Sequence, residues 1–362
     1  MREVSPSFFN KNAFPVCLAP MVGLSHAVLR LIVKDYMPAQ SETIWPTEML
    51  NSRRIPKEIL GKTSETFVLP TEINLVPQLL GNQSQEITES IVKLNQHWNL
   101  SGIDINMGCP VQKALKHNYG VSLMGDMDYA ALVVKYAVEA ASTLEKNIPI
   151  SVKLRAVGSD KSLDELCFFI DKLTDAGASW VTLHPRTAEQ KRRGQSDWNQ
   201  IKYLKSRSRI PIIGNGDIQT ADDVFTMLTE TQADKVMSGR ALTVRPWLMW
   251  QVGERLGLKA PPGRENENAP QTPEEEGAEY GRMLLKFVTL ADKYFIQELK
   301  QSENLILRKI QFFVKTNHVW MQFGNELTSV VNRAKTIPEL KENVSRFFER
   351  EQAMCPRTEL RQ

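Results

Sequence analysis

The stretch IPIIGNGDIQTADDVFTMLTETQADKVMSG, residues 210–239, contains two short apolar runs on either side of a segment with helical periodicity. Each run has the length of a buried strand and leads into glycine. Asp217 and Thr220 stand before the apolar positions of the central segment, and either can cap a helix that begins there. A strand, a helix and a second strand in this order predict two parallel strands joined by a crossover helix.

The same alternation fills most of the chain before residue 259. The other candidate strands have the sequences FPVCLAP, TIWPTEM, INLVPQLL, SGIDINMG, PISVKLR and SWVTLHP, which makes eight with the two above. Amphipathic segments of helical periodicity separate most of them. Eight strand–helix units in about 250 residues predict an α/β fold, a closed (β/α)8 TIM barrel rather than an open, doubly wound sheet.

The remaining sequence divides into two parts. Residues 259–277 are rich in Pro, Glu and Asn and poor in apolar residues, which is typical of a linker. In residues 278–362 apolar positions recur three and four residues apart, and this spacing predicts a small C-terminal helical bundle. We therefore expect a barrel domain over residues 1–258, then a linker and a helical domain.

Composition and charge narrow the class of protein. Hydrophobic residues make up 42% of the chain and charged residues 24%, as in ordinary globular proteins. The sequence has no apolar run of the length of a membrane span, and its first residues lack the order of a secretory signal. Its four cysteines form no CxxC pair, so we expect a reduced, cytoplasmic protein without disulfides or bound metal. The net charge of +3 neither favours nor excludes nucleic acid.

Glycines and an arginine follow the last two candidate strands. Gly214, Gly216 and Asp217 lie at the end of the seventh strand. Gly239 and Arg240 lie at the end of the eighth. Loops at these two positions of a barrel often form a phosphate site, because backbone amides and a helix N-terminus can approach the anion there. The alternative is a pair of tight turns without a ligand.

A lysine and a histidine end two further strands. Lys153 alternates with apolar neighbours and would point into the mouth of the barrel, on the same face as Arg155. A lysine buried there needs an anionic or electron-rich partner, which can be a bound ring, a Schiff-base substrate or a neighbouring carboxylate. His184 is followed by Arg186 and would face the predicted phosphate site. It is either a ligand-binding residue or a hydrogen-bonded structural one.

A free cysteine marks the end of the fourth strand. Cys109 follows Asn106 and Gly108 and precedes a proline. Most free cysteines are small buried hydrophobes. At a barrel mouth beside a cofactor, however, a thiol can act as an acid that delivers one proton. The basic residues that follow can gather phosphates or favour a thiolate; they are Lys113, Lys116 and His117.

Neutral groups end the first and third strands. Gln78 lies in the stretch PQLLGN, and the first strand runs into Pro20–Gly23. A neutral amide at a barrel mouth can hydrogen-bond the edge of a heterocycle. Further cations are either contacts for phosphate groups of a ligand or parts of a solvated surface; they are Lys191, Arg192, Arg193, Arg308, Lys309 and Lys315.

Seven motifs occur in order along the chain. They are LAPMVGLSHAVLR, QLLGNQSQEI, GIDINMGCPVQKALKHNYGVSLM, VKLRAVG, TLHPRTAEQKRRGQSDW, IPIIGNGDI and VMSGRALTVRPWLM. In this combination the sequence resembles the tRNA-dihydrouridine synthases, over the barrel and the helical tail. It departs from the family pattern at Pro185, where HPRT stands in place of the common HGRT, and at KHNYGVSLM, where a run rich in glycine and alanine is common.

The resemblance implies an activity and its ligands. Members of this family bind FMN in a TIM barrel and use NADPH to reduce the C5–C6 double bond of specific uridines in tRNA. We therefore expect FMN and NADPH as cofactors and tRNA as the partner, with 5,6-dihydrouridine, most often in the D-loop, as the product. By the same analogy we expect a monomer without an obligate protein partner or a membrane contact.

The resemblance also assigns roles to residues. It places these around the FMN: Pro20, Met21 and Val22 beside the isoalloxazine, Gln78 and Lys153 at its edge, and His184, Asn215, Gly216, Asp217, Gly239 and Arg240 at the ribityl phosphate. Hydride would pass from N5 of FMN to C6 of uracil, and Cys109 would donate the proton to C5. The resemblance implies that Asn106 and Arg155 hold the target uracil. We also expect substrate contacts from Arg186 and, at the phosphates, from Lys113 and Lys116.

Three other functions remain open at the level of sequence. The first is an FMN-dependent barrel that acts on a free pyrimidine, similar to dihydroorotate dehydrogenase, although the basic loops and the helical tail disfavour it. The second is an aldolase-type barrel without flavin, with Lys153 as a Schiff base. The third is an RNA-binding barrel without catalysis. The sequence does not say which uridines or which tRNAs are modified.

Overall fold

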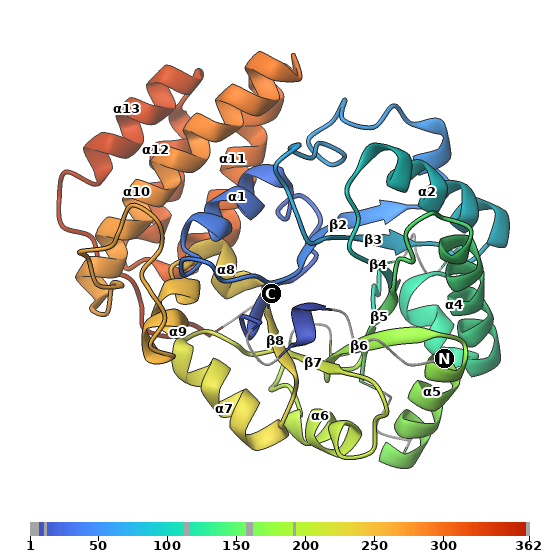
Figure 1. Cartoon of the computed structure of the whole chain (residues 1–362). Helices are drawn as coiled ribbons and strands as arrows, with labels where there is room; N and C mark the ends of the chain where they lie inside the picture. The colour runs from blue at the N-terminus through green and yellow to red at the C-terminus, as the bar shows by residue number, and fades with distance from the viewer. Residues whose placement is uncertain (1–6, 11–12, 112–115, 157–161, 191–192, 360–362) are drawn as a thin grey trace.

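Eight parallel strands form the centre of the molecule in a computed structural model that describes all residues except 1–6, 11–12, 112–115, 157–161, 191–192 and 360–362 (Figure 1). The strands are β1 (Val16–Leu18), β2 (Trp45–Asn51), β3 (Leu75–Leu80), β4 (Ile103–Met107), β5 (Ile150–Arg155), β6 (Ala178–His184), β7 (Ile212–Asn215) and β8 (Lys235–Ser238). Their order is β1-β8-β7-β6-β5-β4-β3-β2. Near the remaining gap, Thr43 donates to the carbonyl of Val16 at 2.7 Å, so the barrel is nearly closed and the predicted fold class is confirmed.

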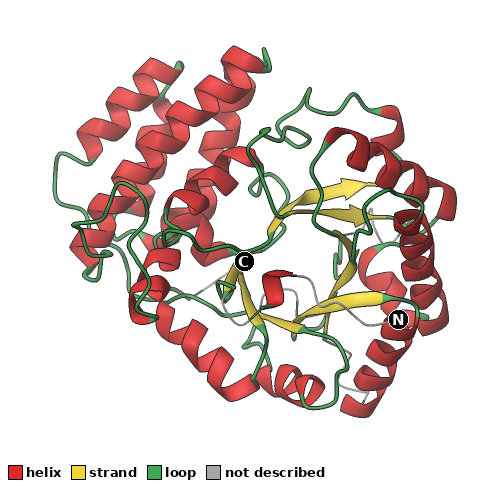
Figure 2. Cartoon of the chain, in the orientation of Figure 1, coloured by secondary structure: helices red, strands yellow, loops and turns green. Residues whose placement is uncertain are grey.

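Helices surround the strands on the outside (Figure 2). They are α1 (Ala27–Asp35), α2 (Ser84–His97), α4 (Met127–Ser142), α5 (Leu163–Asp175), α6 (Trp198–Lys205), α7 (Ala221–Thr231), α8 (Arg240–Val244) and α9 (Leu248–Arg255), with 3-10 turns η1 (Ser7–Phe9), η2 (Ile55–Lys57) and η3 (Gly120–Gly125). Of the two cap candidates, Asp217 and Thr220, it is Thr220 that caps helix α7, in a capping box with Asp223. Between β2 and β3 the chain has the short turn η2 in place of a helix.

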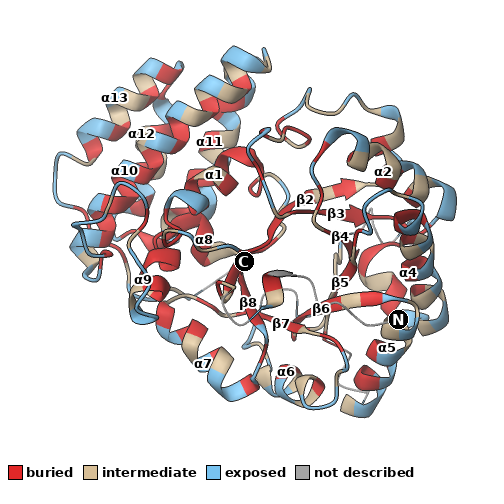
Figure 3. Cartoon of the chain, viewed as in Figure 1, coloured by how far each residue is buried: buried red, intermediate tan, exposed pale blue. Residues whose placement is uncertain are grey.

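Alternation along each strand separates an outer from an inner layer of side chains. In β1, Val16 and Leu18 pack toward the helices, whereas Cys17 lies in a separate inner cluster with Ile213 and Trp180. The ring of Phe8 packs edge-on against Trp180, with 5.2 Å between centroids. Figure 3 shows the buried strands inside half-buried helices. The same alternation turns the polar residues at the strand ends inward.

A helical region follows the barrel and packs beside α1 (Figure 1). It consists of α10 (Pro273–Ala291), a π-helical turn η4 (Asp292–Glu298), α11 (Glu303–Asn317), η5 (His318–Trp320), α12 (Gly324–Arg333) and α13 (Ile337–Phe347). Helix α10 begins inside the segment that we predicted as linker, because Thr272 and Glu275 form a capping box ahead of residue 278. None of the described helices is both long and apolar enough to cross a membrane.

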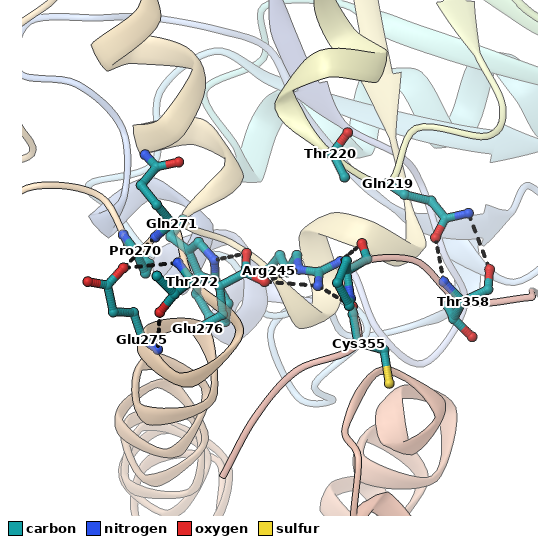
Figure 4. Close-up of polar contacts among 12 residues, drawn as sticks. Gln219, Thr220, Arg245, Pro270, Gln271, Thr272, Glu275, Glu276, Cys355 and Thr358 are labelled. Carbon is teal, nitrogen blue, oxygen red and sulfur yellow. Dashed lines mark hydrogen bonds and ion pairs between the residues drawn. The ribbon is translucent and has the colours of Figure 1, made fainter. Parts of the chain in front are cut away.

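Buried polar contacts fix this helical region to the barrel. Arg245, which follows α8, forms an ion pair with Glu276 of α10 at 2.9 Å, and Trp247 donates to the same carboxylate at 2.9 Å. Figure 4 shows Arg245 between Glu276 and the C-terminal segment at Cys355, whose carbonyl accepts from its guanidinium. Gln219 of the barrel also exchanges hydrogen bonds with Thr358. The assignment of FMN binding to one domain and tRNA binding to the other stays a prediction.

Candidate functional site

The polar residues predicted from the strand ends gather at the carboxyl-terminal mouth of the barrel. The register of the sheet sets Asn106 of β4 beside Lys153 of β5. It also sets Arg155 of β5 beside His184 of β6. Because all strands are parallel, their carboxyl ends open on the same side, and the residues come together as the motif order predicts.

A chain of hydrogen bonds orients the amides at this mouth. Asn106 donates through Nδ2 to Oε1 of Gln78 at 2.7 Å, and Gln78 donates through Nε2 to Oδ2 of Asp104 at 2.7 Å. Ser151 donates to the other oxygen of Asp104 at 2.6 Å. Burial raises the pKa of Asp104 above its usual range, against these hydrogen bonds. These two contacts use one of the two N–H groups and one of the two lone pairs of the Gln78 side chain, and the residue is buried.

Lys153 is a partly buried ammonium without a carboxylate partner among the described residues. Burial is the largest cause that lowers its pKa to about 8, and the charge of Arg155 lowers it further, against Asp104 and Cys17. The sequence left three partners open for Lys153: a bound ring, a Schiff-base substrate and a neighbouring carboxylate. Lys153 forms no salt bridge with a described carboxylate. An anionic or electron-rich ligand would compensate this charge.

His184 lies in a cluster of cations. Burial lowers the pKa of its imidazole to about 2, and the charges of Lys153, Arg155, Arg186 and Arg240 act in the same direction. The ring is therefore neutral at physiological pH. Four positive side chains around a neutral histidine create a region of positive potential at the ends of β5, β6 and β8.

Arg186 is held inside the protein. Its guanidinium forms an ion pair with Asp217 at 2.5 Å and donates to Ser196 Oγ at 2.8 Å and to the carbonyl of Gly194. Its Nη1 lies 3.4 Å from Nε2 of His184. The side chain thus links the loops after β6 and β7. Its role as a substrate contact stays a prediction and would require these bonds to open.

The turns after β7 and β8 meet the first loop. Gly216 has φ of 115°, and a Cβ there would lie 2.2 Å from Ser196 Oγ. The side chain of Asn215 donates through Nδ2 to the backbone carbonyl of Met237 at 2.8 Å and so joins the two strand ends. A Cβ on Gly239 would lie 3.2 Å from Sδ of Met21. These contacts bring residues predicted at the ribityl phosphate next to a residue predicted at the isoalloxazine.

Gly214 and Asp217, both predicted at the phosphate site, make contacts that shape the protein itself. Gly214 lies within β7, and a Cβ there would lie 2.5 Å from Sδ of Met227, so this glycine allows α7 to pack closely. Asp217 has φ of 58° and directs both carboxylate oxygens to the protein, one to Arg186 and one to the amide of Ser196 at 2.6 Å. Its contact with the cofactor stays a prediction.

The loop after β1 is fixed by a carboxylate that the sequence reading did not select. The amide of Gly23 donates to Oε2 of Glu48 at 2.6 Å, and Ser25 accepts from the amide of Met21 at 2.8 Å. Burial raises the pKa of Glu48, and its Oε1 is buried without a described partner. Val22, between the fixed residues, is 62% exposed. The sequence did contain a sign of this role, because Glu48 is an acid inside the apolar stretch TIWPTEM.

Cys109 is half-buried on a turn that its predicted neighbours hold in place. Oδ1 of Asn106 accepts from the amide of Cys109 at 2.9 Å, and Nε of Arg155 donates to the carbonyl of Gly108 at 2.7 Å. A Cβ on Gly120 would lie 2.5 Å from the Cys109 carbonyl, so only glycine fits there. Lys113 lies outside the described residues, whereas Lys116 is exposed. The backbone of this turn is therefore held in place, and the half-buried Cys109 packs beside Leu80 and Tyr119.

Comparison with known proteins identifies the family. A family model described as "Dihydrouridine synthase (Dus)" matches residues 17–349. The chain belongs to the dihydrouridine synthase family. A "Probable tRNA-dihydrouridine synthase" of Aquifex aeolicus is 32% identical over 250 residues, which are 67% of this chain and 75% of that protein.

Two further relatives carry the same name. The Helicobacter pylori protein is 31% identical over 67% of this chain and 71% of its own length. The protein of Rhizobium leguminosarum is 30% identical over 75% of this chain and 79% of its own. The family predicted from seven motifs is confirmed.

Proposed function

We propose that this protein is an FMN-dependent enzyme that reduces the C5–C6 double bond of specific uridines in tRNA to 5,6-dihydrouridine, with NADPH as the reductant. Membership of the dihydrouridine synthase family supports the reaction, and the relatives named tRNA-dihydrouridine synthase support the substrate. The observation that carries the proposal to this chain is Lys153, whose ammonium lies among further cations at the barrel mouth and forms no ion pair with a described carboxylate.

The residues at the mouth fit an anionic cofactor such as FMN. A partly buried cation without a carboxylate and a neutral histidine among cations both favour a bound anion. His184, Gly239 and Arg240 would hold the phosphate, with Asn215, Gly216 and Asp217 shaping its turn. Gln78 and Lys153 would bind the edge of the isoalloxazine beside the loop from Pro20 to Val22. When bound, FMN supplies the hydride for C6 of uracil, and NADPH restores its two electrons.

Cys109 would act as the general acid. Its Sγ–H donates a proton to C5 of the uracil, and the remaining thiolate regains a proton from water. Asn106 and Arg155 hold the amide and carbonyl groups of the turn that carries this cysteine. Asn106 can keep this turn in place and still offer a hydrogen bond to the uracil, since its side-chain amide has a second N–H.

The uridine must leave the stack of the folded tRNA to reach this mouth. Extrusion of a base costs a few kcal/mol, which contacts to the base and to phosphates have to offset. We assign the FMN to the barrel of residues 1–258 and contacts with the body of the tRNA to the helical residues 278–362. Lys116 and Arg193, on loops at the mouth, are candidate phosphate contacts in the barrel.

The test is to purify the protein with its flavin and measure dihydrouridine in unmodified tRNA, with NADPH and with NADH. We expect yellow protein whose FMN is released on denaturation, and dihydrouridine at defined positions, faster with NADPH. Reduction of free uracil at the same rate would instead assign the protein to the free-pyrimidine class. Protein that binds no flavin and forms no dihydrouridine would refute the proposal.

A further inference from the structure

Helix α11 presents one exposed face that mixes apolar and basic side chains. Leu305, Arg308, Phe312 and Lys315 are three or four residues apart, so they share one side of the helix. All four are exposed, whereas the opposite side of α11 is buried in the helical region. We call this face the α11 stripe.

The two cations of the α11 stripe have no ion-pair partner among the described residues. Two cations of α13 differ, since Arg346 pairs with Glu342 at 2.6 Å and Lys341 with Asp292 at 3.7 Å. The exposed positions from Asn304 to Val319 also carry no acidic residue. The stripe is therefore a positive surface, which favours an anionic partner.

Phe312 connects the stripe to the barrel mouth. A Cβ on Gly23 would lie 3.2 Å from Cε1 of this ring, so the ring packs against the backbone of the loop after β1. The ring is nevertheless 46% exposed, and Val22 beside it is 62% exposed. Glu48 holds this loop through the amide of Gly23, which gives the ring a firm support. Phe312 thus offers an aromatic surface to solvent at the rim of the proposed active site.

We propose that the α11 stripe binds the nucleotide next to the reacting uridine, with its base stacked on Phe312 and neighbouring phosphates at Arg308 and Lys315. The inference rests on the proposed function and adds a subsite to it. An aromatic ring between cations is the arrangement by which proteins bind unpaired nucleotides, because the ring stacks on a base while the cations contact the backbone. An acidic polypeptide would use the cations but would leave the ring without a role.

The test compares Phe312 with Phe168, an exposed phenylalanine on helix α5 at the outside of the barrel, which has Lys172 over its ring. Phe312→Ala should raise KM for unmodified tRNA about tenfold, in line with the loss of one stacked base, and leave flavin content unchanged. Phe168→Ala should leave KM unchanged. Phe312→Tyr should restore the wild-type KM, which a merely structural change would not predict.

A spectroscopic measurement tests the stacking itself. In Phe312→Trp holoenzyme, the added tryptophan fluorescence should be quenched when unmodified tRNA saturates the protein, whereas in Phe168→Trp it should not. Wild-type protein that forms dihydrouridine together with unchanged KM in Phe312→Ala and no quenching would overturn this inference alone. Wild-type protein that forms no dihydrouridine would overturn the proposed function as well. Quenching by polyaspartate but not by tRNA would assign the stripe to an acidic protein and refute the subsite.

Discussion

The barrel mouth and the contact between the barrel and the helical region both bury charged side chains. The charges are paired at the contact, whereas at the mouth a cation lacks an ion-pair partner. At the contact, Glu276 accepts from Arg245 and Trp247, and Glu279 accepts from Tyr36 and pairs with Arg264. At the mouth, the cations around His184 outnumber the acids, and Lys153 has no carboxylate partner in the described chain.

The paired charges at the contact stabilise the fold, whereas the unpaired charges at the mouth favour the binding of an anionic ligand. A buried ion pair with all its hydrogen bonds formed is costly to break, because one partner is then left unpaired. A buried cation without a partner lowers the stability of the empty protein and favours an anion that binds there. The two regions should therefore respond in opposite ways to the removal of one charge.

The largest effect should follow removal of a paired charge at the contact. Glu276→Leu leaves the buried Arg245 without its carboxylate and should lower the free energy of unfolding by about 3–5 kcal/mol. Denaturant unfolding measures this change. Glu342→Leu, which breaks the exposed pair with Arg346, is the matched control and should cost at most about 1 kcal/mol. Equal losses in both variants would remove the contrast between buried pairs and surface pairs.

Removal of the unpaired charge at the mouth should affect activity and stability in opposite directions. Lys153→Met should slow dihydrouridine formation about 100-fold, because a positioned positive charge is lost. The same variant without flavin should be at least as stable as wild type, since a partly buried charge is gone. A flavin-free variant that is markedly less stable than wild type would mean that Lys153 has a structural partner after all.

The pH dependence of flavin-free stability sharpens this point. The pKa of Lys153 is about 8 in the folded protein, against 10.5 as its ordinary value. Between these values the unfolded chain binds more protons, so this lysine makes stability rise with pH from about 8 to 10.5. Below about pH 8 its full cost is present. The difference between wild type and Lys153→Met in chemical unfolding should shrink through this window, and a constant difference would contradict it.

A smaller effect concerns the histidine among the cations. His184 should stay neutral in flavin-free protein well below pH 6.5, because its pKa is about 2. FMN should raise this pKa through its phosphate, and Arg240→Gln should also raise it, through loss of a positive neighbour. NMR of histidine-labelled protein measures both, with His184→Gln to assign the signal among five histidines. An imidazole that titrates near pH 6.5 without ligand would show that neither burial nor the neighbouring cations lower its pKa.

The barrel and most of its mouth could be predicted because the signals are local. Glycine or polar residues follow each apolar run, and a parallel barrel brings all these ends to one side. Helix α10 also had a readable start in Thr272 and Glu275, which the polar composition of the surrounding segment obscured.

Contacts between residues that are far apart in the sequence could not be predicted in the same way. Glu48 and Asp104 stand out as acids inside apolar strands, but only the fold brings them to Gly23 and Gln78. The stretch HPRT marks Arg186 as a candidate ligand-binding residue, whereas its bond to Asp217 depends on the approach of the next loop. Three-dimensional contacts therefore decide which polar residues remain available to a ligand.

The most direct test of the account is a single turnover in the absence of oxygen. Flavin-loaded protein is reduced, mixed with unmodified tRNA and followed by the return of flavin absorbance and by the dihydrouridine formed. We expect one dihydrouridine for each flavin reoxidised in wild type, and a rate about 10³-fold lower in Cys109→Ala with unchanged flavin content and tRNA binding. A Cys109→Ala variant that turns over at the wild-type rate, or flavin reoxidation without dihydrouridine, would contradict it.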